Sequence, residues 1–284
     1  MTRDERAGLL YAVAAVALFS TSPVLVRWAA PLSPYEITTW RLGSAALCVL
    51  LWARLSGQPI GIARSDRLRF IGFGLVTALH FAFYIASLNF TTIAHSLALV
   101  YTSPIFVTIA SAWFLREPIA RRRWMGVALA VVGVAILAGF EPRFTARMAF
   151  GDLLALGSAV TYGLYSVAGR SQRARYPLLT YASAVYGLAA LWALPTALLA
   201  LTPAGYGAHQ IAAILALGVL PLGLGHTLYN AALRRAHATS VNLIATQELT
   251  GGVLLGALLL GEVPSPSTIL GAGVTLVGIV LVVL

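Results

Sequence analysis

The chain has 284 residues, of which 59% are hydrophobic and only 10% are charged. A soluble domain carries about 25% charged residues, so this composition excludes a water-soluble globule and predicts an integral membrane protein. The formal charge of +10 is the excess of 19 arginines over nine acidic residues. The arginines cluster between the apolar runs and do not form one continuous basic face, which argues against a nucleic-acid-binding protein. A single cysteine, Cys48, excludes an internal disulfide and a cysteine-based metal cluster.

Ten apolar runs predict ten membrane-spanning helices, because a helix needs roughly 20 apolar residues to cross a bilayer. Lipid leaves open backbone groups unsatisfied, so the runs are expected to be helices and not isolated strands. The first run exceeds the 7–15-residue core of a signal peptide and is expected to be retained. In chain order the runs cover residues 7–28, 34–55, 68–90, 95–115, 124–139, 151–169, 178–201, 209–234, 239–260 and 267–284.

The chain repeats itself at an offset of about 145 residues, which indicates an internal duplication. Residues 114–118 end one apolar run and residues 259–264 end its counterpart. Each copy holds five spans, and because five is odd the second copy is expected to be inverted in the membrane. We therefore predict an all-α polytopic protein of two inverted five-helix repeats, residues 1–140 and 141–284, around a central cavity. Matching positions include Tyr84 with Tyr229, Gly126 with Gly271, and Gly133 with Gly278.

The arginines support the inversion. With the N-terminus inside, fifteen arginines fall in inside segments and three in outside segments, a strong positive-inside bias. Four arginines lie around the connection between the second and third spans, whereas the equivalent loop of the second copy, residues 202–208, has none. We expect both termini to be cytoplasmic, in a bacterial inner (plasma) membrane.

Together these features resemble the ten-span EamA-type branch of the drug/metabolite transporter superfamily, over essentially the whole chain. The resemblance rests on the doubled Leu-x-Glu motifs at Glu117 and Glu262, the paired glycines and tyrosines, and Arg41 in the second span. One departure is that the second copy has Ala184 where the first has Arg41. The resemblance implies transport of small metabolites, often export, through a cavity lined by both halves. Among family members the chain looks most like the aromatic amino-acid exporters.

Polar side chains inside the spans are the candidate substrate-binding residues, because polar groups in a bilayer usually face a cavity or a partner. Tyrosine rings offer a π-face to an ammonium group, and amides offer donors to a carboxylate. Each residue could instead make interhelix contacts, which helical periodicity cannot separate from a cavity position. The set is His80, Tyr84, Tyr101, Tyr162, Tyr165, His226, Tyr229, Asn230, Asn242 and Gln247.

Two charged residues lie within spans. Glu248 is the only carboxylate well inside a span, so it is expected to be protonated, paired or wetted by the cavity. With His80 and His226 it is a candidate for proton coupling; the alternative is a structural bond that holds the ninth helix. Arg41 could pair with Glu248, bind a substrate carboxylate or extend its charge toward the membrane surface.

Four residues are candidates for gating or hinge motion. Pro23 and Pro104 fall within spans, where proline frees a backbone carbonyl and permits a kink. Glu117 and Glu262 sit at helix ends, and inversion would place them on opposite membrane faces.

The sequence therefore predicts a transporter that works by alternating access, best assigned to export of aromatic amino acids. Alternatives are export of cationic drugs or nucleosides, or a membrane scaffold that transports nothing. An enzyme is not expected, because no His-Glu-x-x-His, Gly-x-Ser-x-Gly or paired-aspartate pattern is present. No metal, cofactor or nucleotide-binding loop is expected, which leaves facilitated export or proton coupling. The expected partners are a small-molecule substrate and the lipid bilayer, and a monomer suffices because both halves lie in one chain.

Overall fold

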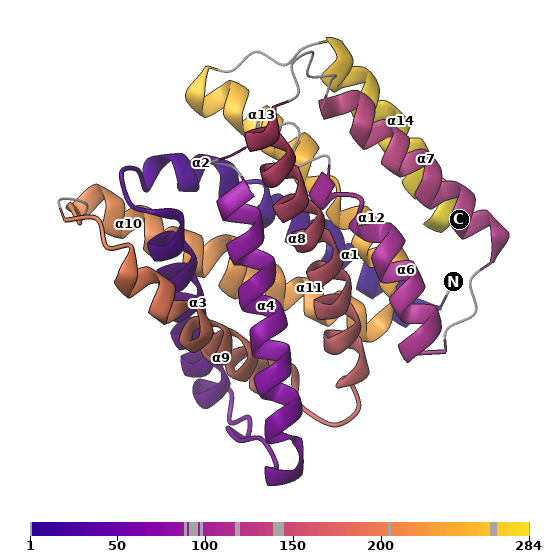
Figure 1. Cartoon of the computed structure of the whole chain (residues 1–284). Helices are drawn as coiled ribbons and strands as arrows, with labels where there is room; N and C mark the ends of the chain where they lie inside the picture. The colour runs from indigo at the N-terminus through magenta and orange to yellow at the C-terminus, as the bar shows by residue number, and fades with distance from the viewer. Residues whose placement is uncertain are drawn as a thin grey trace.

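The computed structural model describes residues 2–87, 90, 96, 99–116, 120–138, 145–203, 206–261 and 266–283, so Glu117 and Glu262 lie outside the described residues. All regular elements in these ranges are helical (Figure 1). The first half contains α1 (Arg3–Phe19), α2 (Ser22–Trp28), α3 (Pro34–Leu55), η1 (Arg64–Asp66), α4 (Arg67–Ser87), α6 (Ser103–Phe114) and α7 (Arg121–Ala138). The second contains α8 (Ala146–Ser171), α9 (Leu178–Leu199), α10 (Ala208–Leu217), η2 (Gly218–His226), α11 (Thr227–Arg235), α12 (Ala238–Ala245), α13 (Glu248–Leu260) and α14 (Pro266–Val283).

Helices or pairs of helices follow the ten predicted spans. By length and apolarity alone, five of the described stretches qualify as membrane spans: Arg3–Trp28, Arg64–Ser87, Leu178–Leu199, Ala208–Arg235 and Ala238–Leu260. Local sequence signals explain several helix starts. Thr2 with Glu5, and Ser33 with Glu36, form capping boxes in which the hydroxyl accepts from a backbone N–H and the glutamate bonds back.

The packing of the helices follows the duplication seen in the sequence. In the first copy α4, the third span, packs on α8 and α9, the first two spans of the second copy. The third span of the second copy ends with η2 and α11, which pack on α1; η2 also packs on α3. Likewise α6 packs on α8, and its counterpart α12 packs on α1. Exchanging the copies therefore exchanges these contacts, as a pseudo-two-fold axis between the copies requires.

The helices α3 and α9 pack along their lengths and are joined at both ends by hydrogen bonds. Near the start of α3, Glu36 accepts from the Thr202 hydroxyl (2.6 Å) and the Tyr206 hydroxyl (2.6 Å), both just beyond the end of α9. Beyond the end of α3, Pro59 O accepts from Thr180 Oγ1 (2.6 Å), near the start of α9. The two helices must therefore run antiparallel.

Asp66 makes a second contact close to the start of α9. This residue is 3% exposed. Its oxygens accept from the Tyr176 hydroxyl at 2.5 Å and pair with Arg175 at 3.0 Å. The hydrogen bond to Asp66 raises the pKa of the Tyr176 phenol. The loop after α3 is thereby fixed to the loop before α9.

The helices α7 and α14 are the fifth spans of the two copies. They form a close pair toward one side of the molecule (Figure 1). A Cβ at Gly133 would lie 2.4 Å from the backbone nitrogen of Thr275, and one at Gly278 would lie 2.5 Å from that of Ala130. These contacts leave no room for a side chain, so the repeated glycines serve close helix packing, as small residues do between membrane helices.

Candidate functional site

Helix interruptions in four spans surround one internal cavity. The first span breaks at Ser20 and Thr21, between α1 and α2, and the ninth breaks at Thr246 and Gln247, between α12 and α13. The fourth span turns just before α6, and the eighth contains the π-helical segment η2. Residues at or beside these interruptions line the cavity: Phe19, Ser22, Val100, Tyr101, Pro221, His226 and Glu248. Discontinuous helices at mid-membrane are a recurrent way to build a binding site in transporters.

The breaks have local causes. Ser20 and Thr21 turn their hydroxyls back onto the carbonyls of Val16 (2.8 Å) and Leu18 (2.7 Å), and Pro23 follows. Pro104 stands in the first turn of α6, where its missing N–H costs nothing. Pro23 and Pro104 thus accompany real interruptions, while their role as hinges stays a prediction.

The cavity is small in this conformation. Its volume is about 30 Å³, room for about one water molecule and far below the roughly 300 Å³ of a typical small-molecule site. A metabolite the size of an amino acid can enter only if the surrounding helices move apart.

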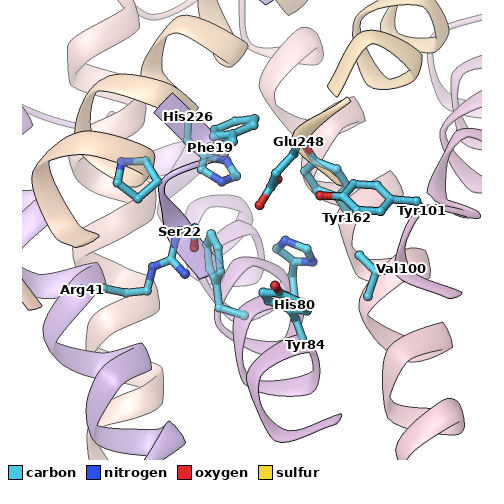
Figure 2. Close-up of a pocket in the computed structure, with 12 residues that line it drawn as sticks. Phe19, Ser22, Arg41, His80, Tyr84, Val100, Tyr101, Tyr162, His226 and Glu248 are labelled. Atoms are coloured by element: carbon cyan, nitrogen blue, oxygen red, sulfur yellow. The ribbon is translucent and has the colours of Figure 1, made fainter. Parts of the chain in front are cut away.

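An arginine and a glutamate face each other across this space, as Figure 2 shows for Arg41 and Glu248. Arg41 is 2% exposed, and its guanidinium carbon lies 4.6 Å from the centroid of the Phe81 ring. Its Nε has no hydrogen-bond partner in the described part of the chain. Glu248 is the first residue of α13, where the helix dipole favours a negative charge, and it is hydrogen-bonded to Tyr101. The cavity is therefore lined by a guanidinium and by a carboxyl group that lie apart from each other.

Two histidines complete the polar lining. His80 is held by α8: its Nδ1 lies 3.1 Å from the carbonyl oxygen of Ser158 and 2.9 Å from the Ser158 hydroxyl. A carbonyl can only accept, so Nδ1 carries the proton and Nε2 remains an acceptor. His226 packs on Phe19, with ring centroids 4.4 Å apart, and its buried Nδ1 has no partner among the described residues.

Aromatic rings form one continuous wall of the cavity. Tyr162 stacks on His80 with a centroid distance of 4.7 Å and an interplanar angle of 12°. Tyr162 also stacks on Tyr229 at 5.6 Å. Such a wall offers apolar area together with π-faces that attract a cation.

A second polar cluster lies directly behind this wall. The Tyr229 hydroxyl bonds to Ser166 Oγ (2.6 Å) and accepts from Asn242 Nδ2 (3.2 Å), while Asn242 Oδ1 accepts from Ser103 Oγ (3.1 Å). Asn230 donates to the Tyr165 hydroxyl at 2.7 Å. These bonds join α6, α8, α11 and α12, so the cluster connects helices from both copies.

The structure divides the predicted site residues into two groups. His80, Tyr84, Tyr101, Tyr162, His226 and Glu248 line the cavity. Outside its lining are Tyr165, Tyr229, Asn230, Asn242 and Gln247; the first four belong to the cluster behind the wall, and Gln247 Oε1 accepts from Thr250 (3.1 Å). The substrate-binding and proton-coupling roles of all these residues remain predictions.

The sequence-based set omits several residues that line the cavity. For Arg41 the sequence left substrate binding open as one of three possible roles. Its position as an isolated basic residue inside a span was the signal that pointed to the cavity. Phe19 and Val100 carried no polar signal; only their positions beside a Ser-Thr-Ser-Pro stretch and beside Tyr101 pointed to the cavity.

An all-helical, duplicated membrane fold with a charged cavity between its halves defines a membrane transporter and not an enzyme. The model of the EamA-like transporter family matches the chain twice, over residues 6–139 and 149–284, so the chain belongs to this family of multi-pass membrane transporters.

Similar proteins include exporters of small metabolites. An uncharacterised transporter of Archaeoglobus fulgidus is 26% identical, with 88% of each chain covered. The pseudopaline exporter CntI of Pseudomonas aeruginosa is 28% identical, over 94% of this chain and 92% of that protein. The aromatic amino acid exporter YddG of Ancylobacter novellus is 25% identical over 81% of each. A crystal structure with 18% identity has a TM-score of 0.83 over 97% of this chain and 96% of the other, which shows a common fold.

Proposed function

We propose that this transporter exports small amino-acid-like zwitterions, with aromatic amino acids as its best substrates. The observation that carries the proposal is the placement of Arg41 and Glu248 on opposite sides of one buried cavity. An α-amino acid carries a carboxylate for the guanidinium and an ammonium for the carboxylate. The wall of Tyr162, His80 and Phe81 then receives the side chain.

One relative is named as an exporter of aromatic amino acids, which supports the proposed solute, and another is named as an exporter of pseudopaline. In the proposed cycle, helices separate at the interruptions around the cavity and expose it to one side of the membrane at a time. The two inverted copies, with a division near residue 140, supply the two alternative openings. The protein works in a bacterial inner membrane with both termini in the cytoplasm, as the arginine distribution favours.

The test is transport by the purified protein in liposomes, with and without a pH gradient. Counterflow of labelled phenylalanine is measured against a panel of amino acids, nucleosides and cationic drugs. Competition by aromatic amino acids and not by the other two classes is expected. Competition by cationic drugs alone would replace the proposed substrate class, and no counterflow with any solute would favour a scaffold. A rate that depends on the pH gradient and is lost in Glu248→Gln would assign proton coupling to that residue.

A further inference from the structure

A second and larger hollow lies away from the cavity, on the outer face of α4 and α8. It is a groove of about 590 Å³, within the range of small-molecule sites. Its walls are largely apolar, with Leu68, Val76 and Leu164 among them, and Phe114 of α6 also lines it. We call it the α4–α8 groove. Its lining residues contribute nothing to the charged cavity.

The groove is shorter than one leaflet of the membrane is thick. From Arg69 to Val76 along α4 is seven residues, or about 10 Å at a rise of 1.5 Å per residue, and Ser171 to Leu164 along α8 is the same distance. A bilayer core is about 30 Å thick, so the apolar part ends before the midplane.

One end of the groove is cationic. Arg69 and Arg175 both line it, and their side chains are 51% and 52% exposed. Both pair with the carboxylate of Asp66, whose side chain is only 4% exposed. Two half-exposed cations share one buried anion, so a net positive charge remains at the rim. Beside them, the buried Gln172 Oε1 has no hydrogen-bond partner among the described residues.

The floor of the groove is open at Gly72. A Cβ built there meets nothing within 4 Å, whereas one at Gly74, on the opposite side of α4 and facing α9, would lie 2.5 Å from Leu188 Cβ. Gly72 therefore leaves space that helix packing does not use.

We propose that the α4–α8 groove binds an anionic glycerophospholipid from the leaflet that contacts the arginine-rich loops. One acyl chain lies along Gly72 and Val76, and the phosphate lies at Arg69 and Arg175. Arginine forms short, charge-assisted hydrogen bonds with phosphate, and basic pockets between membrane helices select anionic headgroups. The bound lipid packs α4 against α8, the two helices that the His80–Ser158 bonds also join.

Lipid binding to the purified protein in a neutral detergent tests the proposal by native mass spectrometry. Phosphatidylglycerol and phosphatidylcholine with identical chains are titrated separately. The wild type should bind one phosphatidylglycerol at least fivefold more tightly than phosphatidylcholine. Arg69→Gln should weaken phosphatidylglycerol about fivefold, the effect of roughly 1 kcal/mol per basic residue near anionic lipid. Gly72→Phe should abolish the single high-affinity site by filling the groove.

Matched controls are available in the same chain. Arg67→Gln removes the same charge two residues earlier, outside the groove lining. Gly43→Phe fills an uncharged groove of about 310 Å³ on α3 and α10, where a Cβ also meets nothing within 4 Å. Both controls should bind phosphatidylglycerol like the wild type. Equal affinity for the two lipids, or unchanged affinity in both Arg69→Gln and Gly72→Phe, would mean ordinary annular contact and overturn the proposal. If Gly72→Phe does not fold, the Arg69→Gln titration decides.

Discussion

Replacing Arg41 by glutamine tests how the cavity recognises a substrate. The guanidinium is buried, and in the described part of the chain no carboxylate lies within 4 Å of it. Glutamine keeps a donor of shorter reach and removes the charge. Because no carboxylate within 4 Å among the described residues loses its partner, and because a buried cation is itself costly, the variant should fold with a thermal stability close to that of the wild type.

The expected loss of affinity follows from the bond that the substrate carboxylate would make. A hydrogen bond to a charged group contributes about 1.5–3 kcal/mol. At 1.4 kcal/mol per tenfold change, Arg41→Gln should raise the apparent dissociation constant of phenylalanine by roughly 10- to 150-fold. The contact between Arg41 and Phe81, at 4.6 Å, adds a smaller cation–π term that is lost with or without substrate.

The assay is counterflow of labelled phenylalanine in liposomes, with two analogues as competitors. Phenethylamine lacks the carboxylate, and 3-phenylpropionate lacks the ammonium group. Arg41→Gln should weaken phenylalanine and 3-phenylpropionate while competition by phenethylamine is unchanged; Glu248→Gln should weaken phenylalanine and phenethylamine instead. Arg54→Gln, which removes an exposed charge from the far end of the same helix, is the control. If Arg41→Gln weakened phenethylamine as much as phenylalanine, Arg41 would support the cavity and would not bind the carboxylate.

Three further predictions concern the fold. Gly74→Val should destabilise the protein by about 1–3 kcal/mol, because its Cβ would lie 2.5 Å from Leu188 Cβ, whereas Gly72→Val on the same helix should have little effect in the same thermal melts. Equal melting temperatures would contradict the packing of α4 on α9. Glu36→Gln should lower the free energy of unfolding by about 1–3 kcal/mol, because the hydroxyls of Thr202 and Tyr206 lose a charged acceptor. The loop near Thr202 should then be cleaved by added protease. Protection equal to that of the wild type would mean that other contacts hold the loop. In a Cys48→Ala background, Ser65→Cys and Gly207→Cys should react with an impermeant thiol reagent from opposite sides of the membrane, and labelling from one side would refute the inversion of α3 and α9.

The number, type and order of the helices could be predicted from the sequence. Apolar runs of span length leave helices as the only stable structure in lipid, and the opposite arginine content of paired loops indicates inversion. The repetition of Gly133 at Gly278 marks a packing position that could be read from the sequence, because neither glycine leaves room for a Cβ. The interruption near Ser20 was also foreseeable from the local chemistry of Ser-Thr-Ser-Pro.

Which polar residues face the cavity was decided only by the tertiary structure. Tyr162 and Tyr165 lie three residues apart on one face of α8, yet Tyr162 lines the cavity and Tyr165 bonds to Asn230 of α11. The helical period shows on which face of its helix a side chain lies, but it does not show whether that face contacts the cavity or another helix. Arg41 and Glu248, 207 positions apart in sequence, come to one space because α3 and the α12–α13 break pack around the same centre. Composition and repetition determine the spans, because each helix satisfies its own backbone hydrogen bonds. The site lies between spans, so the residues that meet a given side chain there depend on how all the helices pack.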